Sequence, residues 1–337
     1  MKTTSLSTFS RDFTDEEIRS YVGDLESLPS GELTVSLLVG CGERAIAALR
    51  EYLLRGRPRG IFQPRQRAVE ALARLGAKDV LIEYLSQKRN IPDAEVRFGE
   101  EAVENTAARA LGVWRTDAVF DFLQELAERR MLAGVMEALG TFERVEAADT
   151  FVRALGDDVC RPAADEALCR IAGKVKPVLI RAALRNRDEA EEGPSERRRR
   201  RGVMKILSEL PFTTEEWNEL RPLLGDGDKE IALAAAEIAT DCAPPEERQE
   251  AARVLIHSFA KAHWFTQARI QDCLRRNYDA VREVIAEELA SRQRCARGAP
   301  MADHVFRVLT KMQITRRPSD SPERESHGKR EEPAGRG

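Results

Sequence analysis

Apolar residues recur every three or four positions along most of the chain, in runs that end at glycine or proline. The clearest example spans residues 64–85, where Pro64 opens one apolar stripe, Gly76 ends it, and a second stripe follows. Proline suits a first helical position because its φ is fixed, and glycine can take the left-handed conformation that ends a helix. The spacing therefore predicts two amphipathic helices in 64–85, neither of which could bury its apolar face alone.

The same pair of helices recurs along the chain, with no alternating pattern that would indicate a strand. We therefore predict an all-α fold, an α-α superhelix or solenoid of about seven or eight helical hairpins. The steps between equivalent helix ends vary from 28 to 38 residues, which is too irregular for an ankyrin or tetratricopeptide array. The predicted helix ends lie at or near Gly76, Gly112, Gly140, Gly173, Pro211, Asp241 and Cys273.

The pattern divides the chain into four parts. Residues 1–42 hold less regular helices that we expect to cap the array, and residues 43–295 hold the repeats, with a polar insertion at 186–201. A further amphipathic helix is expected within 296–315. Residues 316–337 carry six basic and five acidic residues and a single alanine as their aliphatic content. That tail cannot bury enough apolar area to offset its ordering entropy, so we predict that it is disordered.

Two stretches carry a resemblance to a known family. Residues 67–76 read RAVEALARLG, and residues 226–238 read DGDKEIALAAAEI, with small residues that let neighbouring helices approach closely. They resemble HEAT-like repeats of the PBS-lyase type, which are common in bacterial proteins, and the likeness covers about residues 40–295. The resemblance implies an armadillo-like helical solenoid that offers an interaction surface, and it leaves the activity open because members differ widely in function.

Composition narrows the function classes. The chain has 337 residues, of which 54 are Lys or Arg and 57 are Asp or Glu, so its net charge is −3. That balance argues against a protein that coats nucleic acid, which needs a large positive excess to release counterions from phosphates, although local basic patches remain possible. No secretory signal begins the sequence and no apolar run approaches 18 residues, so we expect a cytoplasmic protein with no membrane span.

The sequence gives catalysis no support. No nucleophile and base stand at a recognisable spacing, and no phosphate loop or paired-carboxylate motif is present. The cysteines form no CxxC pair and have no histidine at ligand spacing, so we expect reduced and mostly buried thiols, with no metal and no cofactor. The six are Cys41, Cys160, Cys169, Cys242, Cys273 and Cys295.

The strongest charge imbalance lies between residues 43 and 67, where two glutamates oppose seven arginines. Guanidinium groups bind phosphate or carboxylate through parallel hydrogen bonds, and the glycines and proline within 56–60 would keep a loop exposed. One interpretation is a site for an anion or an acidic partner. The other is a solvated segment whose charges pair with the acidic stretch 79–104. The candidate binding residues are Arg44, Arg50, Arg55, Arg57, Arg59, Arg65 and Arg67.

A second candidate is the run of five arginines at 197–201. On a helix these side chains would point all around the axis, so few could face one ligand, and the acidic residues just upstream favour self-neutralisation. A switchable tether or a nucleic-acid contact is the alternative. We take Arg197, Arg198 and Arg199 as the candidates here.

Exposed tryptophans can serve as stacking platforms for nucleic-acid bases. Trp217 keeps core spacing, Trp114 follows a turn, and Trp264 lies at a helix junction, so the spacing predicts that all three pack into the protein. Among HEAT-like proteins, the DNA glycosylases for alkylated bases use an arginine-rich surface with an exposed tryptophan and a carboxylate. Trp114 with Asp117 is the one adjacent pair of that kind.

The sequence favours a non-catalytic scaffold or adaptor that binds another protein, one with an acidic surface, on the concave face of the solenoid. A nucleic-acid-binding protein of the glycosylase type is the first alternative. A protein resembling bilin lyases is the second, and the scattered cysteines give it no support. The oligomeric state and the identity of the partner stay open.

Overall fold

The computed structural model describes residues 13–27, 29–58, 60–184, 192–295 and 303–315. All regular secondary structure within these ranges is helical, which confirms the predicted all-α repeat fold. The predicted disordered tail lies outside the described residues. None of the described helices is long and apolar enough to cross a membrane. The helices are α1 (Asp15–Asp24), α2 (Gly31–Gly40), α3 (Arg44–Arg55), α4 (Gln63–Arg74), α5 (Lys78–Ser86), α6 (Ala94–Leu111), α7 (Asp117–Arg129), α8 (Ala133–Gly140), α9 (Ala148–Ala154), α10 (Arg161–Ala183), α11 (Pro194–Leu207), α12 (Thr214–Leu220), α13 (Lys229–Cys242), α14 (Pro245–Phe259), α15 (Trp264–Arg276), α16 (Tyr278–Cys295) and α17 (His304–Thr315), with short 3-10 helices η1 (Val145–Ala147) and η2 (Arg221–Gly225).

The chain forms two compact units that meet within α13, at residues 235 and 236. Unit 1 holds α1 to α12 and the start of α13. Unit 2 holds the rest, where α14 packs on α15 and α16, and α16 packs on α17. The apolar pattern of the sequence gives no sign of this boundary, because the stripe of α13 runs through it.

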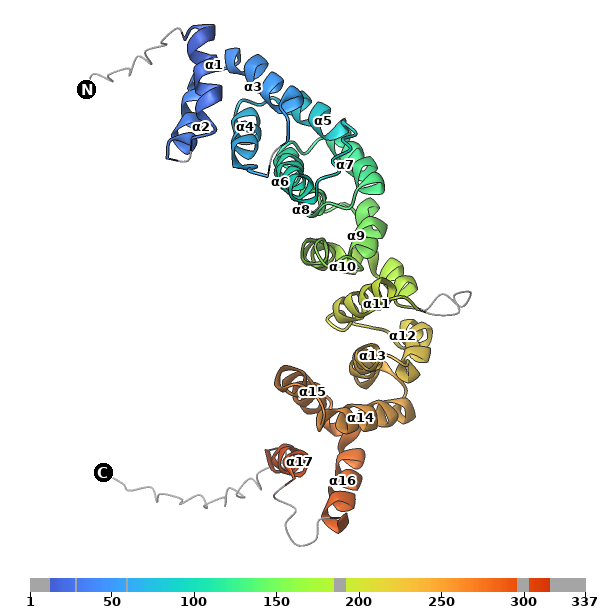
Figure 1. The fold of residues 1–337 in the computed structure, drawn as a ribbon. Helices are drawn as coiled ribbons and strands as arrows, with labels where there is room; N and C mark the ends of the chain where they lie inside the picture. The colour runs from blue at the N-terminus through green and yellow to red at the C-terminus, as the bar shows by residue number, and fades with distance from the viewer. Residues whose placement is uncertain (1–12, 28, 59, 185–191, 296–302, 316–337) are drawn as a thin grey trace, which may run out of the picture. The chain divides into compact units, whose positions relative to one another are not determined.

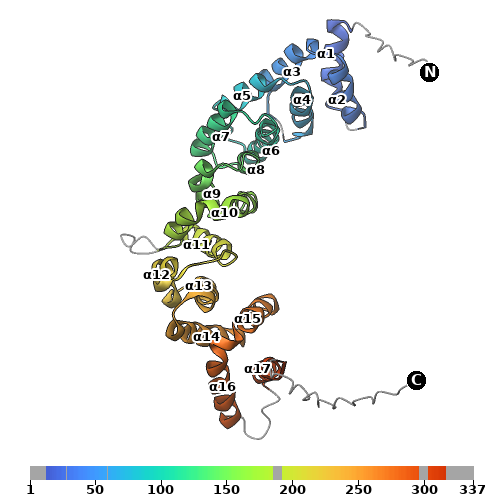
Figure 2. The ribbon, with the colours of Figure 1, turned by 180° about the vertical axis from the view of Figure 1, so that it is seen from behind.

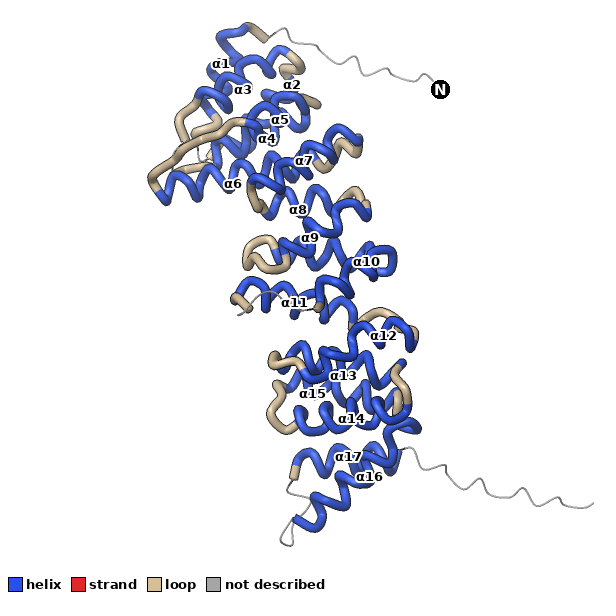
Figure 3. Tube along the Cα trace, turned by 90° about the vertical axis from the view of Figure 1, so that its right-hand side faces the viewer, coloured by secondary structure: helices blue, strands red, loops and turns tan. Residues whose placement is uncertain are grey.

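Unit 1 is built from two layers of helices (Figures 1 and 2). The layer that we call inner contains α2, α4, α6, α8 and α10 in succession, and it lies on the inner side of the curve that unit 1 follows. The outer layer contains α1, α3, α5, α7 and α9. Figure 3 shows the connections gathered at the edges of the stack. Each hairpin packs on the next one, which is the arrangement of a solenoid.

The hairpin at 64–85 forms as its sequence predicts. Pro64 lies in the first turn of α4, and Gly76 has a φ of +76°, the left-handed conformation that ends this helix and turns the chain into α5. The buried residues of α4 include Ala68, Ala71 and Leu72. Small residues also set the approach of α8 to α6, because a Cβ at position 134, now glycine, would overlap the carbonyl group of Asn105.

Two helix starts are fixed by capping boxes. Thr14 with Glu17 opens α1, and Thr213 with Glu216 opens α12, in each case with the hydroxyl accepting from the third helical N–H and the carboxylate accepting from the cap N–H. Trp217 in α12 is fully buried, as predicted.

Two local predictions are wrong. The turn expected at Gly173 does not exist, because α10 runs unbroken through it and through Pro177. The buried stripe Ala172, Val175 and Leu179 continues across the glycine, and packing against α8, α9 and α11 outweighs its low helix propensity. Trp264, expected in the core, is 72% exposed at the start of α15.

Candidate functional site

The arginines between residues 44 and 67 do not gather into one exposed patch. Arg44 of α3 donates to Asp15 of α1 over 2.9 Å, and Arg50 pairs with Glu83 of α5, so both link neighbouring hairpins. Arg55 lies 3.5 Å from Glu51 of its own helix. Arg57 is exposed on the connection that follows, and Arg59 lies outside the described residues.

The other two arginines of this set are buried. The guanidinium group of Arg67 donates to the carbonyl oxygens of Leu25 and Ser27, over 2.9 and 3.0 Å, and to Glu32 over 3.2 Å. It therefore ties α4 to the turn between α1 and α2 and to the first turn of α2. Because two of its nitrogens donate to these three oxygens, Arg67 is a structural residue that links α4 to the first hairpin.

Arg65 belongs to a buried ionic network centred on Glu100 of α6, whose side chain is 3% exposed. Glu100 accepts from Arg65 over 3.0 Å, from the hydroxyl group of Tyr84 over 2.7 Å, and from Arg89. The guanidinium groups of Arg65 and Arg89 also lie over the Tyr84 ring, 5.8 and 4.8 Å from its centroid. Burial and the nearby Glu100 carboxylate raise the pKa of Tyr84, so its hydroxyl stays protonated and donates.

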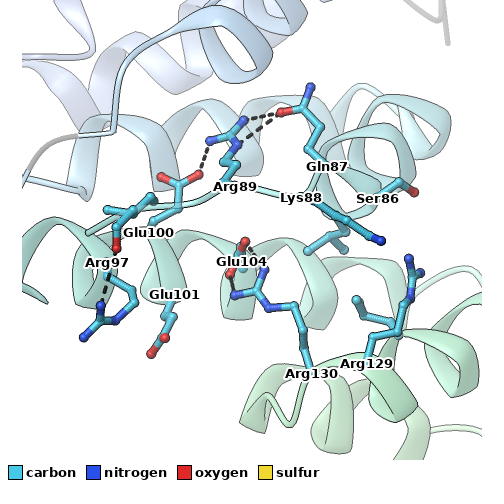
Figure 4. Close-up of a pocket in the computed structure, with 13 residues that line it drawn as sticks. Ser86, Gln87, Lys88, Arg89, Arg97, Glu100, Glu101, Glu104, Arg129 and Arg130 are labelled. Atoms are coloured by element: carbon cyan, nitrogen blue, oxygen red, sulfur yellow. Dashed lines mark hydrogen bonds and ion pairs between the residues drawn. The ribbon is translucent and has the colours of Figure 1, made fainter. Parts of the chain in front are cut away.

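The pocket of Figure 4 opens beside this network, at the edge of unit 1 where α5 passes into α6 and α7 ends. Its volume is about 450 Å³. The side chains that line it are mostly charged, and the apolar part comes from Leu85, Ile91 and Leu126. The charged lining residues are Lys88, Arg89, Arg97, Glu100, Glu101, Glu104, Arg129 and Arg130.

A second buried carboxylate, Glu104, lies one helical turn after Glu100. Both of its oxygens accept from Arg130, the residue that follows α7 (Figure 4). Burial raises the pKa of Glu104, and the bonds from Arg130 oppose that rise. Two of the three carboxylates in the lining are thus already paired with arginines from other elements.

Sequence reasoning missed this pocket. One available signal was the position of Glu100 and Glu104, which are four residues apart and share a helix face with the buried Ala107 and Leu111. A glutamate on the apolar face of a helix needs a partner, so this register indicates a buried ionic pair. The sequence does not show which arginines supply it.

The run at 197–201 lies in α11, and each of its arginines pairs with at least one carboxylate of unit 1. Arg200 is 1% exposed and donates to the carbonyl oxygen of Ala183 over 2.8 Å, to Glu192 over 2.9 Å and to Asp226. Its neighbours form exposed or half-exposed contacts with groups near the start of α11 and at the ends of other elements. These are Arg197 with Glu192 and Asp228, Arg198 with Asp158 and the carbonyl oxygen of Gly156, Arg199 with Glu196, and Arg201 with Asp228 and Glu230. The run is therefore neutralised within unit 1.

Trp114 and Asp117, the pair that the glycosylase alternative requires, lie at the turn that leads into α7. Trp114 is half-buried, and the Asp117 side chain is 90% exposed and accepts from Arg144 over 2.7 Å. Neither residue lines the pocket of Figure 4.

The cysteines are all free, four of them buried and Cys169 and Cys295 exposed. Burial raises the pKa of Cys160 to about 12 and that of Cys273 to about 11, which keeps both thiols protonated. Among the described residues, no group of three or more His, Cys, Asp or Glu could hold a metal ion.

In the described part of unit 2, the buried carboxylate of Glu237 has one oxygen without a hydrogen-bond partner. Glu237 of α13 pairs with Arg269 of α15 through Oε2, while its buried Oε1 has no hydrogen-bond partner. Burial raises the pKa of Glu237 above 4.5, against the attraction of Arg269. The folded protein therefore binds this proton at a pH where the unfolded chain has lost it.

We expect this glutamate to make stability fall as pH rises. Above pH 4.5 the native state binds more protons at Glu237 than the unfolded state, so the free energy of unfolding decreases until the raised pKa is passed. The Glu237→Gln variant has no titrating group at this position. The difference between its melting temperature and that of the wild type should therefore shift in favour of the variant as pH rises from 4.5 to 7. Glu250→Gln, at an exposed position of α14, is the control. Parallel pH profiles for wild type and Glu237→Gln would contradict the assignment.

Comparison with known proteins does not assign the chain to a family. No model of a known protein family matches the chain. No curated protein matches it either.

Proposed function

We propose that this chain is a HEAT-like scaffold that binds a segment of another protein on the inner layer of unit 1, without catalysing a reaction. The support comes from a groove of about 500 Å³ that crosses α2, α4 and α6. Successive inner helices face the same side in a solenoid, and such proteins use that side for extended contacts.

The groove combines polar side chains with exposed apolar ones. Gln63 and Thr106 line it, and so does Val113, which is 78% exposed. Leu33, which follows the lining residue Glu32 in α2, is 71% exposed. Large apolar side chains that stand in water beside a polar groove are typical of a protein-binding surface, and their exposure is the observation that carries this proposal.

The fixed polar contacts make this surface rigid. Gln66 of α4 donates to the carbonyl oxygen of Ala102 over 3.3 Å and to Thr106 over 3.0 Å, both on α6. Arg109 of α6 pairs with Glu137 of α8, so the next helix is tied in as well. A preformed groove loses little conformational entropy when a partner binds.

The experiment is affinity purification from the native cell with the wild-type chain, a groove variant and a matched control. The groove variant carries Leu33→Glu and Val113→Glu. The control carries Val159→Glu, which alters a valine that is 72% exposed on the α9–α10 connection. We expect wild type and control to recover the same partner and the groove variant to lose it.

Titration with the purified partner would then give the dissociation constants of the wild-type chain, the groove variant and the control. Burying two aliphatic side chains contributes about 3 kcal/mol or more, so the groove variant should bind at least about a hundredfold more weakly. The proposal would be wrong if the partner bound the groove variant as tightly as it binds the wild type. It would also be wrong if the wild-type chain recovered no protein above background.

A further inference from the structure

We propose that the pocket of Figure 4 binds a small organic dianion of the phosphate monoester class, with Lys88 and Arg129 as the residues that hold its charged group. This site is separate from the inner-layer groove, so the inference does not depend on the proposed scaffold function.

The charges of the lining do not cancel. Five cationic side chains face three carboxylates, which leaves two positive charges. Glu100 and Glu104 are already neutralised by Arg89 and Arg130 in the lining. The remaining lining charges are one carboxylate, Glu101, and three cations, Lys88, Arg97 and Arg129. A phosphate monoester carries about −1.5 to −2 at neutral pH, which matches this excess, whereas one carboxylate would leave a cation uncompensated.

Two of these cations can turn toward a ligand at little cost. Lys88 is exposed, and the Arg129 guanidinium lies 3.6 Å from Glu125 in an exposed pair one turn back on α7. Such a pair contributes little to stability, so exchanging it for a ligand loses little. Figure 4 shows Lys88 and Arg129 on the same side of the pocket, reaching from different elements toward one another.

The backbone that carries Lys88 is held in place on both sides. Gln87 and Arg89 bond to each other, with Arg89 Nε donating to Gln87 Oε1 over 3.1 Å. Arg89 also donates to the Leu53 carbonyl oxygen over 3.2 Å and to buried Glu100. The buried network therefore fixes the α5–α6 connection before a ligand arrives, and this preorganisation lowers the entropy cost of binding.

The size and the apolar lining indicate more than a bare ion. A volume of about 450 Å³ falls within the range of small-molecule sites, roughly 300–1,000 Å³. It is far larger than a single tetrahedral oxyanion needs. Ile91 is half-buried and offers apolar surface against which an organic body could lie, above the buried Leu85 and Leu126.

The test is titration calorimetry of the full chain with phenyl phosphate, an apolar phosphate monoester, at constant ionic strength. Benzoate serves as the monoanion, and a glutamate-rich peptide serves as the source of acidic side chains. The proposal expects phenyl phosphate to bind at least about tenfold more tightly than benzoate or the peptide, because two charge-assisted contacts are satisfied together.

The double variant Lys88→Gln, Arg129→Gln should weaken phenyl phosphate binding at least about tenfold. Its matched control is Lys174→Gln, Arg74→Gln. Arg74 lies 3.7 Å from Glu70 in the same kind of exposed pair at the end of α4, and Lys174 is an exposed lysine of α10. The control variant should bind as wild type does.

Three results would overturn the inference. Binding that survives in the double variant would show that these residues do not hold the ligand. Equal or tighter binding of benzoate would remove the dianion class. Binding of the peptide without phenyl phosphate would assign the pocket to the acidic side chains of a protein partner.

Discussion

The Glu100→Ala variant is expected to lose about 3–5 kcal/mol of the free energy of unfolding of unit 1, the range found when one partner of a buried ionic group is removed. Glu100 is the common acceptor for Arg65, Arg89 and the hydroxyl group of Tyr84. Its removal leaves the Arg65 side chain, 5% exposed, without its carboxylate. The buried guanidinium group then loses its main compensation for leaving water.

The effect should be local first, because a solenoid need not unfold in one step. Hydrogen exchange of the α6 amides is therefore the measurement, together with the thermal unfolding of the full chain. Glu101→Ala is the matched control, since this neighbouring glutamate is half-exposed, and it should change stability by less than about 0.5 kcal/mol. Similar losses for the two variants would show that the network does not stabilise α6.

The Arg200→Ala variant is expected to lose a similar amount, about 3–5 kcal/mol. The Glu192 and Asp226 side chains are 10% and 13% exposed, and both depend on this guanidinium group, as does the carbonyl oxygen of Ala183. Truncating Arg200 removes the cation that joins these two nearly buried carboxylates and leaves Glu192 with only the longer contact to Arg197, at 3.6 Å. Like charges in a poorly hydrated site destabilise the fold in addition to the lost bonds.

Arg197→Ala is the control for this prediction. Arg197 lies in the same run, but its side chain is 49% exposed and its nearest carboxylate atom is 3.6 Å away, so its loss should cost less than about 1 kcal/mol. Hydrogen exchange of the α10 and α11 amides would separate the two variants. If Arg197→Ala destabilised these helices as much as Arg200→Ala, burial would not be what distinguishes the two arginines.

Much of the fold could be predicted because helix pairs are encoded locally. Pro64, Gly76 and the apolar stripe between them lie within a dozen residues, and the capping box of Thr14 and Glu17 spans a single turn. Where the local signal failed, tertiary packing prevailed, as at Gly173, where a helix-ending residue sits inside a continuous helix. The division at residue 235 has no local signal at all.

The candidate sites were predicted less well, because a charge imbalance does not reveal which charges already have partners. The carboxylates that pair with Arg44, Arg50 and Arg65 lie 29 to 35 residues away in the sequence. The pocket of Figure 4 joins the end of α5, the first half of α6 and the end of α7, so no single segment of sequence contains it.

The sequence by itself determined that this protein is an array of paired helices with abundant arginine, since apolar periodicity and caps act within one or two turns. Only the tertiary structure decided what each arginine does. Arg67 and Arg200 are occupied inside the protein, whereas Lys88 and Arg129 face an open pocket. The reason is that the role of a charge depends on its burial and on the groups around it, and both arise when separate hairpins stack.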